Sequence, residues 1–412
     1  MKQESLENFL DREESEGYST LPSGWRWVRL GEVCEFLDSK RIPVNDAERQ
    51  KRIVGKKQSE LYPYYGANGQ VGWIDGYLFD EELVLLAEDG GFFGSLERPI
   101  AYRVSAKCWV NNHAHVLRAK RDMIDVDWLY FTLAIRPDII EFVSGTTRPK
   151  LNQEQASLIP ILLPPVSIQH RIAAKLQELM QEIYNLKSAI INQSEAAKAL
   201  PSAYLRQVFE SEEAKKWERK RLGEVCEKII GGGTPSRGCP EYWGGSIYWL
   251  SPSELEEEKL NYVSQTKEKI TEEGSNNSNA KIVPPKSVLL SCTASVGKVA
   301  ISEVPLTTNQ QFNSFVLKNT MAIPDFVAYY LIYRKDDIKQ LGGKTTFTFI
   351  SKDEIADLLL LLPSLKEQKL IASELKEKMA QVENLQSKIY NHQSAIDALP
   401  QAILRKAFRG EL

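Results

Sequence analysis

The sequence predicts a duplicated protein in which two mixed α/β, strand-rich globular domains are each followed by a long α-helix. Three observations support this fold class. A seven-residue segment occurs twice, an apolar seam with helical spacing occurs twice, and short apolar runs fill the regions between them. At 412 residues the chain is too long for one hydrophobic core and fits two to four domains. We therefore expect two copies of one unit, with the two long helices packed against each other as a coiled coil.

Composition and the repeat positions divide the chain into five segments. Acidic residues dominate the beginning, which is typical of a frayed end. The expected segments are a lead-in at 1–20, a first globular domain at 21–164, a helix region at 165–210, a second globular domain at 211–362 and a second helix region at 363–412.

The repeat is visible at several places along the chain. Arg-Leu-Gly-Glu-Val-Cys-Glu begins at Arg29 and again at Arg221 (221 − 29 = 192). Thr146-Thr147 corresponds to Thr345-Thr346 with an offset of 199 (345 − 146 = 199), and this offset then holds through both helices. Loops tolerate insertions whereas the register of a helix does not, so the changing offset indicates loops and the constant offset indicates helices.

Apolar residues at steps of three and four define each long helix. No proline or glycine occurs between Val166 and Leu200, which allows about 33 helical residues and a length of roughly 50 Å. Both copies then reach Leu-Pro and a short amphipathic tail. Ser364 and Glu367 form a capping-box pattern at the start of the second helix. The seams are Ile168, Ile172, Leu176, Leu179, Ile183, Leu186 and Ile190, and Ile371, Leu375, Met379, Val382, Leu385 and Ile389.

Short apolar runs broken by Gly, Pro and Asn predict the strands of the globular domains. Longer apolar segments predict one further helix in each domain, over Trp128–Arg136 and Phe326–Arg334. The expected strands include Leu83–Leu86, Ala101–Val104, His115–Leu117, Val288–Leu290 and Phe315–Leu317.

Charge and cysteine usage restrict the function classes. The net charge of −3 does not by itself indicate nucleic-acid binding, although basic runs occur near Arg49 and near Arg334. No apolar run approaches a membrane span and no signal-peptide core precedes the first domain, so we expect a cytoplasmic protein without membrane contact. Five cysteines without a C-x-x-C pair indicate reduced thiols and no zinc site.

Motifs in both copies carry a resemblance to a known family. In this order and duplicated they are specific, and the chain resembles the specificity (S) subunit of type I restriction-modification enzymes over nearly its whole length. The motifs are Gly24-Trp25 with Arg29–Glu35, Tyr64–Gly69, Asn111–Leu117, Leu162–Pro165, Gly232–Ser236, Tyr242–Gly245, Thr308–Gln311, and Leu362-Pro363 with Gln368.

The resemblance implies a subunit without an active site or a cofactor. Each of two target-recognition domains would read one half of a bipartite asymmetric site in double-stranded DNA. Two methyltransferase (modification) subunits would dock on the helices, and a restriction/translocase subunit would join the assembly. The family also implies antiparallel helices with a pseudo-twofold axis, whereas the sequence alone permits a parallel pair. Readers on one face of B-DNA are spaced by about 34–36 Å, which a rod of this length accommodates.

Residues that can hydrogen-bond to base edges recur at matching places in the two domains. Asn and Gln recognise adenine, and Arg or Lys recognises guanine. A single Asn-Gly or Gly-Gly-Thr is more often a turn, but the clusters as sets favour DNA binding. The candidates are Tyr64, Asn68, Gln70, Asn112, His113, Thr147 and Arg148 in the first domain, and Thr234, Ser236, Arg237, Ser295, Lys298, Gln310, Gln311, Lys344 and Thr346 in the second.

Two other function classes remain open, a standalone DNA methyltransferase and a coiled-coil scaffold with ligand-binding domains. Catalytic patterns are incomplete: Gly343-Lys344-Thr345 lacks the glycine that a phosphate loop needs five residues earlier, where Ile338 stands. His113 and His115 could face one side of a strand, but no further ligands complete a metal site, so we expect none.

Overall fold

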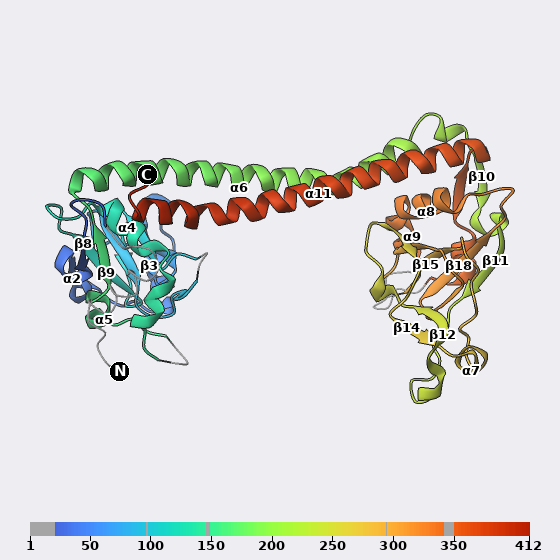
Figure 1. Cartoon of the computed structure of the whole chain (residues 1–412), viewed down its shortest axis with the longest axis horizontal. Helices are drawn as coiled ribbons and strands as arrows, with labels where there is room; N and C mark the ends of the chain where they lie inside the picture. The colour runs from blue at the N-terminus through green and yellow to red at the C-terminus, as the bar shows by residue number, and fades with distance from the viewer. Residues whose placement is uncertain (1–20, 96–97, 146–148, 294, 342–349) are drawn as a thin grey trace. The chain divides into compact units, whose positions relative to one another are not determined.

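The computed structural model describes residues 21–95, 98–145, 149–293, 295–341 and 350–412. The chain forms two compact units. Unit 1 comprises Met1–Ala189 with His392–Leu412, and unit 2 comprises Ile190–Asn391. Each unit therefore contains one globular domain together with part of each long helix, and Figure 1 shows these elements by label.

Unit 1 is built around an antiparallel four-stranded sheet in the order β2-β8-β5-β6. A three-stranded sheet, β4-β3-β7, and the pair β1-β9 complete its β-structure. Its strands are β1 (Arg26–Arg29), β2 (Cys34–Phe36), β3 (Tyr62–Gly66), β4 (Gly69–Ile74), β5 (Leu83–Ala87), β6 (Ala101–Val104), β7 (Trp109–Val110), β8 (Ala114–Ala119) and β9 (Pro160–Leu163). Its shorter helices are α2 (Leu30–Val33), α3 (Asp46–Ile53), α4 (Val126–Ala134) and α5 (Gln153–Ser157), with 3-10 turns η1 (Asp38–Lys40), η2 (Gln58–Glu60) and η3 (Pro137–Phe142).

Unit 2 repeats this plan with one strand added. Its main sheet has the order β11-β18-β15-β16-β13, and β14-β12-β17 and the pair β10-β19 match the smaller sheets of unit 1. The strands are β10 (Glu218–Arg221), β11 (Cys226–Gly231), β12 (Trp243–Leu250), β13 (Leu260–Val263), β14 (Glu268–Ile270), β15 (Val288–Ser291), β16 (Val299–Ser302), β17 (Leu306–Thr308), β18 (Phe312–Leu317) and β19 (Leu359–Leu362). The shorter helices are α7 (Glu272–Asn276), α8 (Pro324–Tyr333), α9 (Lys335–Leu341) and α10 (Lys352–Ala356), with 3-10 turns η4 (Ala214–Lys216), η5 (Leu222–Val225), η6 (Pro240–Tyr242) and η7 (Pro252–Glu254). The strands and helices expected from the apolar runs are confirmed, as is the duplicated mixed α/β fold.

The repeated seven-residue segment forms the same tight turn in both units. Its Leu and Val side chains, Leu30 and Val33 in the first copy, are fully buried. A Cβ on Gly31 would lie 3.1 Å from Ser157 of α5, and one on Gly223 would lie 3.2 Å from Ala356 of α10. The motif is therefore retained because its glycine lets the turn pack closely against a short helix.

The two long helices are α6 (Val166–Phe209) and α11 (Leu365–Phe408), each of 44 residues. They are longer than expected because neither ends at its Leu-Pro: Pro201 and Pro400 lie inside the helices. A proline removes one backbone donor, which frees the carbonyl four residues earlier. In unit 2 the freed carbonyl of Ala197 accepts a bond of 3.5 Å from Nε2 of Gln386 on α11. The expected capping box is confirmed, with the Ser364 N–H donating to Glu367 Oε2 at 3.0 Å.

The helices run antiparallel where they meet. In unit 1 the start of α6, at Ile172 and Leu176, shares a core with the end of α11, at Leu404 and Ala407. In unit 2 the end of α6, at Leu205 and Phe209, shares a core with the start of α11 around Leu375. The helix ends also carry matching phenylalanines. Phe408 lies edge-on to Trp128 of α4 at 5.6 Å, and Phe209 lies edge-on to Phe326 of α8 at 5.6 Å.

Burial along the seam follows a period of seven residues. Leu176, Ile183 and Ile190 are buried on α6, as are Leu375, Val382 and Ile389 on α11. Two residues expected in the seam are exposed, Leu186 by 47% and Leu385 by 41%. The prediction was wrong for these two because steps of three and four describe a wider stripe than one partner helix covers.

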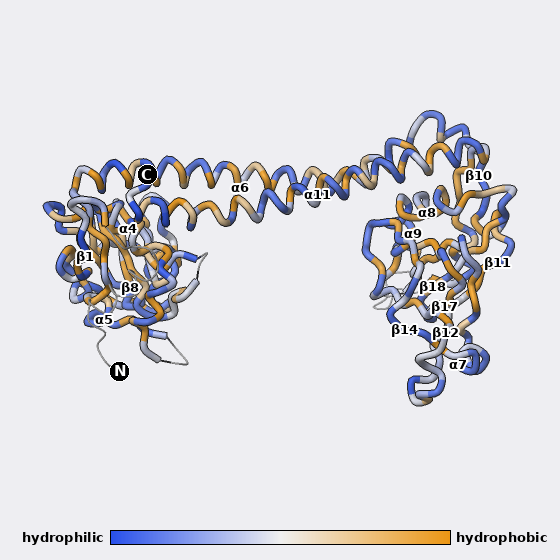
Figure 2. The backbone as a smooth tube through the Cα atoms, viewed as in Figure 1, coloured by the Kyte–Doolittle hydropathy of each residue, from blue (hydrophilic) through white to orange (hydrophobic). Residues whose placement is uncertain are grey.

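Hydrophobic segments gather inside each globular domain, where Figure 2 shows the strands mainly in orange, while the helices alternate between the two colours. None of the helices among the described residues is long and apolar enough to cross a membrane. All five cysteines lie in the described part of the chain and are free thiols, as expected. Burial raises the pKa of Cys34, Cys108 and Cys226 to about 12.

Candidate nucleic-acid interface

The same loop precedes the matching central strands β8 and β18. In unit 1 it reads Asn111-Asn112-His113 and in unit 2 Asn309-Gln310-Gln311. The backbone N–H of His113 donates to Asn111 Oδ1 at 2.8 Å, and that of Gln311 donates to Asn309 Oδ1 at 3.0 Å. This side-chain turn fixes the loop conformation in both copies. The two residues after each asparagine differ, Asn112-His113 in unit 1 and Gln310-Gln311 in unit 2. The same loop conformation therefore presents different side chains in the two copies.

In unit 1 three loops meet at this place. Nδ2 of Asn68, in the β3–β4 hairpin, donates to the Gly90 carbonyl at 3.0 Å, and His113 Nδ1 pairs with Asp89. Asn68, Gln70 and Asn112 are exposed, and the His113 side chain is 39% exposed. The structure therefore brings Asn68 and His113 to one edge of the domain, where their polar atoms are accessible. Gln70 lies on β4 and donates to the Gly72 carbonyl at 3.1 Å.

Tyr64 does not belong to this accessible set. Its side chain is buried in β3, with a residue exposure of 3%, and its hydroxyl donates to the Val44 carbonyl at 2.9 Å. The Arg49 guanidinium covers the ring at 4.9 Å from the ring centroid. Tyr64 therefore has no free face or hydroxyl for a base, and we remove it from the candidate interface.

In unit 2 the corresponding loop contacts two others. The Thr234 hydroxyl donates to Gln310 Oε1. The Gln311 carbonyl accepts from the Cys292 N–H at 2.7 Å, and Gln311 Oε1 accepts from Asn309 Nδ2 at 2.9 Å. Thr234, Gln310 and Gln311 are thus brought together, and the segment that carries Ser295 begins beside them. Ser295 is partly exposed.

Arg237 is the most rigidly held basic candidate. Its guanidinium forms two parallel bonds with Glu268 of β14, Nη1–Oε1 at 2.5 Å and Nη2–Oε2 at 2.8 Å. The same group lies 3.6 Å from the ring centroid of Trp243 and 5.2 Å from that of Trp249, both in β12. The bond from Arg237 holds the pKa of Glu268 below its usual value. With 55% of its side chain exposed, Arg237 is oriented but still accessible.

Ser236 and Lys298 have different roles. Ser236 is exposed in the Arg237 loop, and its hydroxyl accepts from the Gly238 N–H at 3.3 Å. Lys298 Nζ donates to the carbonyls of Pro252 at 3.0 Å and Leu255 at 2.8 Å. Its ammonium therefore serves to fix the loop before β13, and we remove Lys298 from the candidate interface.

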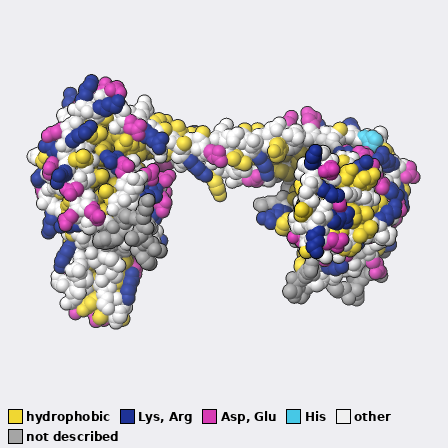
Figure 3. All heavy atoms as spheres, turned by 180° about the vertical axis from the view of Figure 1, so that it is seen from behind, with side chains coloured by type: hydrophobic (Ala, Val, Ile, Leu, Met, Phe, Trp, Pro, Cys, Tyr) yellow, Lys and Arg dark blue, Asp and Glu magenta, His cyan; other side chains and the backbone are white. Residues whose placement is uncertain are grey.

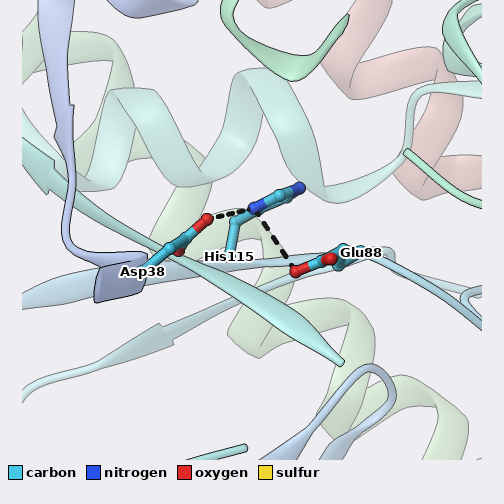
Figure 4. A group of neighbouring side chains, drawn as sticks. All are labelled: Asp38, Glu88 and His115. Atoms are coloured by element: carbon cyan, nitrogen blue, oxygen red, sulfur yellow. Dashed lines mark hydrogen bonds and ion pairs between the residues drawn. The ribbon is translucent and has the colours of Figure 1, made fainter. Parts of the chain in front are cut away.

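Three ionisable side chains, Asp38, Glu88 and His115, form a largely buried cluster in unit 1 (Figure 4). His115 is 1% exposed, and its Nδ1 lies 2.5 Å from Asp38 Oδ2 and 3.8 Å from Glu88 Oε2. Arg41 contacts Glu88 at 2.7 Å and Lys150 contacts it at 3.0 Å. One ligand atom from each of Asp38, Glu88 and His115 lies within 4.8 Å of the others. Arg41, however, pairs with both carboxylates, at 3.6 Å from Asp38 and 2.7 Å from Glu88. At the matching place in unit 2 a neutral pair occurs, with Asn313 Nδ2 3.3 Å from Cys292 Sγ.

The two basic runs are largely compensated within their own units. Arg52 and Lys56 both pair with Asp75, at 2.6 and 2.8 Å, and Lys335 pairs with Glu258 at 3.0 Å. Figure 3 shows basic and acidic side chains interspersed on the visible face of each unit. On that face, and among the described residues drawn there, phosphate contacts would therefore come from individual side chains, because no broad basic patch is visible there.

Four candidates, Thr147, Arg148, Lys344 and Thr346, lie outside the residues that the structure describes. Sequence reasoning missed the residues that orient the candidates. Asn111 and Asn309 could have been found from their place beside the candidates in both copies. Asp89 and Glu268 could not, because each is more than twenty residues from its partner in the chain.

Two domains of one fold, each presenting amide- and cation-bearing loops and each joined to a pair of long helices, define a duplicated recognition protein. A family model for the type I restriction modification DNA specificity domain matches residues 22–196 and again 214–392. The chain belongs to this family.

Relatives and solved structures are consistent with that family over most of the chain. The MjaIX specificity subunit of Methanocaldococcus jannaschii is 33% identical over 39% of this chain, a match that spans 37% of the relative. The EcoDI specificity subunit of Escherichia coli is 22% identical over 95% of this chain and 89% of its own length. The HsdS subunit from Thermoanaerobacter tengcongensis has a similar fold, with a TM-score of 0.63 at 23% identity over 96% of this chain and 99% of that chain.

Proposed function

We propose that the chain is the non-catalytic DNA-recognition subunit of a type I restriction-modification complex. Residues 21–164 and 211–362 would each read one half of a bipartite asymmetric site. The helix regions 165–210 and 363–412 would fix the spacer and dock two methyltransferase subunits, with restriction/translocase subunits completing the assembly. The observation that carries this proposal is the loop turned by Asn111 in unit 1 and by Asn309 in unit 2, which holds different side chains in an identical frame.

Within this proposal the base-reading residues are those whose polar groups are accessible. Among the described residues they are Asn68, Gln70, Asn112, His113, Thr234, Ser236, Arg237, Ser295, Gln310 and Gln311. Thr147, Arg148, Lys344 and Thr346 lie outside the described residues and stay in the proposal on the sequence alone. Asn and Gln in such positions suit adenine, and an oriented Arg suits guanine.

Exposed apolar residues on the helices support the docking of partner proteins. Tyr184 is 69% exposed and Ile191 53% exposed on α6, and Tyr390 is 72% exposed on α11. The intramolecular pair therefore leaves apolar surface uncovered on both helices, which is the surface that an interface uses. A cytoplasmic location belongs to the same proposal, because the relatives come from bacteria and an archaeon, whose DNA lies in the cytoplasm.

Selection from random-sequence duplexes tests this function. The chain would be assembled with its methyltransferase subunits and incubated with a pool of random duplexes, and the bound fraction sequenced. We expect two short words separated by a constant unread spacer. Enrichment without a two-part motif would overturn the proposal.

A second assay separates the standalone methyltransferase. The chain alone would be incubated with DNA and labelled S-adenosylmethionine. We expect methyl transfer only after methyltransferase subunits are added, and transfer by the chain alone would favour the enzyme. If the chain contacts DNA phosphates, its affinity for DNA should fall as the salt concentration rises. The scaffold alternative predicts no such salt-dependent DNA binding.

A further inference from the structure

Two buried glutamines occupy matching positions in the first turns of the long helices. Gln169 follows the start of α6 by three residues, and so does Gln368 in α11. Their exposures are 0% and 1%, although glutamine is ordinarily a surface residue. The family assignment does not explain why a polar amide should be buried at this point in both copies.

In unit 1 the Gln169 amide joins two segments that are distant in the chain. Its Nε2 donates to the carbonyl of Pro164, at 2.7 Å, and to that of Met123, at 3.0 Å. Its Oε1 accepts from the N–H of Asp125 at 2.8 Å. Asp125 is the N-cap residue of α4, and Pro164 lies just before α6. The side chain therefore ties the start of α4 to the start of α6.

In unit 2 Gln368 makes the same three bonds. Its Nε2 donates to Pro363 at 2.9 Å and to Met321 at 3.0 Å, and its Oε1 accepts from Ile323 at 2.9 Å. Ile323 is the N-cap residue of α8, the counterpart of α4. The same set of bonds therefore occurs at matching positions in both units.

The hydrogen bonds of each glutamine restrain the angle between a short helix and a long helix, which are α4 and α6 in unit 1 and α8 and α11 in unit 2. Each amide uses both of its N–H groups and its oxygen, and a buried polar group left without a partner is costly. Rotation of α4 or α8 against its long helix would break at once the two bonds that reach the segment before the short helix. Other contacts hold the domains together without them, since Trp128 Nε1 donates to Leu162 at 2.9 Å and the Tyr330 hydroxyl donates to Leu359 at 3.1 Å.

We propose that Gln169 and Gln368 are positioning residues that lock each recognition domain at one angle on its long helix, and that this lock sets how sharply the protein selects the spacer of its DNA site. The inference rests on the proposed function. α4 packs against the sheet that presents the reading loops, through β5, β6 and β8, and α8 packs against β15 and β16. If the glutamine bonds are lost, the short helix and its sheet can rotate against the long helix, and the proposed reading loops move with them.

The test uses the full chain assembled with its methyltransferase subunits. Gln169→Met and Gln368→Met would be made singly and together, because methionine fills a similar volume without polar hydrogens. Gln169→Glu is a second variant, since a carboxylate still accepts from Asp125 but cannot donate to the two carbonyls. Gln181→Met is the matched control, because Gln181 is exposed on α6 and bonds only to Asn185 at 3.1 Å among the described residues. Affinity would be measured on duplexes carrying both words at the preferred spacer and at spacers changed by one or two base pairs.

We expect each Gln→Met substitution to reduce the preference for the best spacer over its neighbours by about fivefold, the equivalent of one net hydrogen bond of about 1 kcal/mol. The control should keep the wild-type preference. A purely structural role would weaken binding at all spacers by the same factor, and that result would overturn the proposal. If the wild-type complex itself shows no two-part site, the proposed function fails instead. If the Met variants do not fold, a wild-type spacer preference in Gln169→Glu would also refute the lock.

Discussion

Arg237 shows at the scale of one residue how a proposed base-reading side chain can be oriented before DNA is present. The Glu268 carboxylate fixes two of its N–H groups, and the Trp243 ring fixes the plane of the guanidinium. An arginine normally loses much side-chain freedom when it binds a base edge. Because part of that ordering has already occurred, Arg237 should bind a guanine at lower entropic cost than a free surface arginine.

Replacing Arg237 with alanine should therefore affect one position of one half-site. We expect a loss of about 1–3 kcal/mol of discrimination at a guanine read by unit 2, with the other half-site unchanged. Arg237→Lys should not restore it, because lysine lacks the planar fork. Arg221→Ala is the control, since Arg221 is an exposed arginine of the same unit that pairs with Asp357 at 3.0 Å. Competition binding with single-base variants of the site measures both. Equal weakening on all sequences would show that Arg237 contacts a phosphate.

Individual site residues could be predicted from the sequence only by residue type and repeat position. Those signals identify Asn112, His113, Gln310 and Gln311, which lie at matched loops. They also selected Tyr64 and Lys298, whose polar groups are used inside the fold. Residue type cannot separate these cases, because the partners that consume a hydroxyl or an ammonium come from distant parts of the chain.

At the scale of one element, a single carboxylate pairs with two basic side chains at and just after the end of α3. Asp75 follows β4 and pairs with both Arg52 and Lys56 at the end of α3. The hydrogen bond from Lys56, with that from Arg52, holds the pKa of Asp75 below its usual value. A carboxyl with a lowered folded-state pKa stabilises the fold above its unfolded pKa of about 3.9, and this contribution is lost as the pH falls through the folded pKa.

Asp75→Asn should therefore lower the free energy of unfolding at pH 7 by about 1 kcal/mol or less. The difference from the wild type should stay constant above pH 5 and vanish toward pH 2. Thermal or urea unfolding followed at several pH values tests this. A difference that grows on acidification would show that the ionised carboxylate is not the stabilising form.

The long helices allow a direct test of the spacer at the element scale. Their buried seam repeats every seven residues, so removing seven keeps the remaining apolar positions in phase. Deleting residues 190–196 and 389–395 together shortens each helix by about 10 Å. We expect the unread spacer to shrink by about three base pairs while both words are retained. Deleting four residues from each helix is the out-of-phase control and should impair folding. An unchanged spacer would contradict the claim that the length of the helix pair sets the spacer length.

The two long helices could be predicted from the sequence, because burial of one helix face places apolar residues at regular intervals along the chain. The apolar steps of three and four and the offset of 199 were sufficient to find α6 and α11. Their C-terminal ends were not predictable, because Pro201 and Pro400 lie inside the helices. A freed carbonyl can find another donor, as that of Ala197 does. The exposure of Leu186 and Leu385 also escaped prediction, since an apolar seam does not reveal how many partners cover it.

At the scale of the whole molecule, the two copies share the residues that fix the backbone and differ in side chains at the candidate interface. The turn motif, the buried glutamines and the loop asparagines match between the units. The ionisable Glu88 and His115 of unit 1, however, are replaced by Cys292 and Asn313 in unit 2. Two copies with different reading loops account for an asymmetric two-part site, which identical copies would not produce.

The measurement that tests this account most directly is a map of methylated bases across the genome of cells that carry the chain and its methyltransferase subunits. We predict methylation at an asymmetric motif of two short words separated by a constant number of unread base pairs, lost when the chain is removed. Methylation at a single continuous motif, or at a symmetric one, would contradict the claim that two diverged domains each read one word.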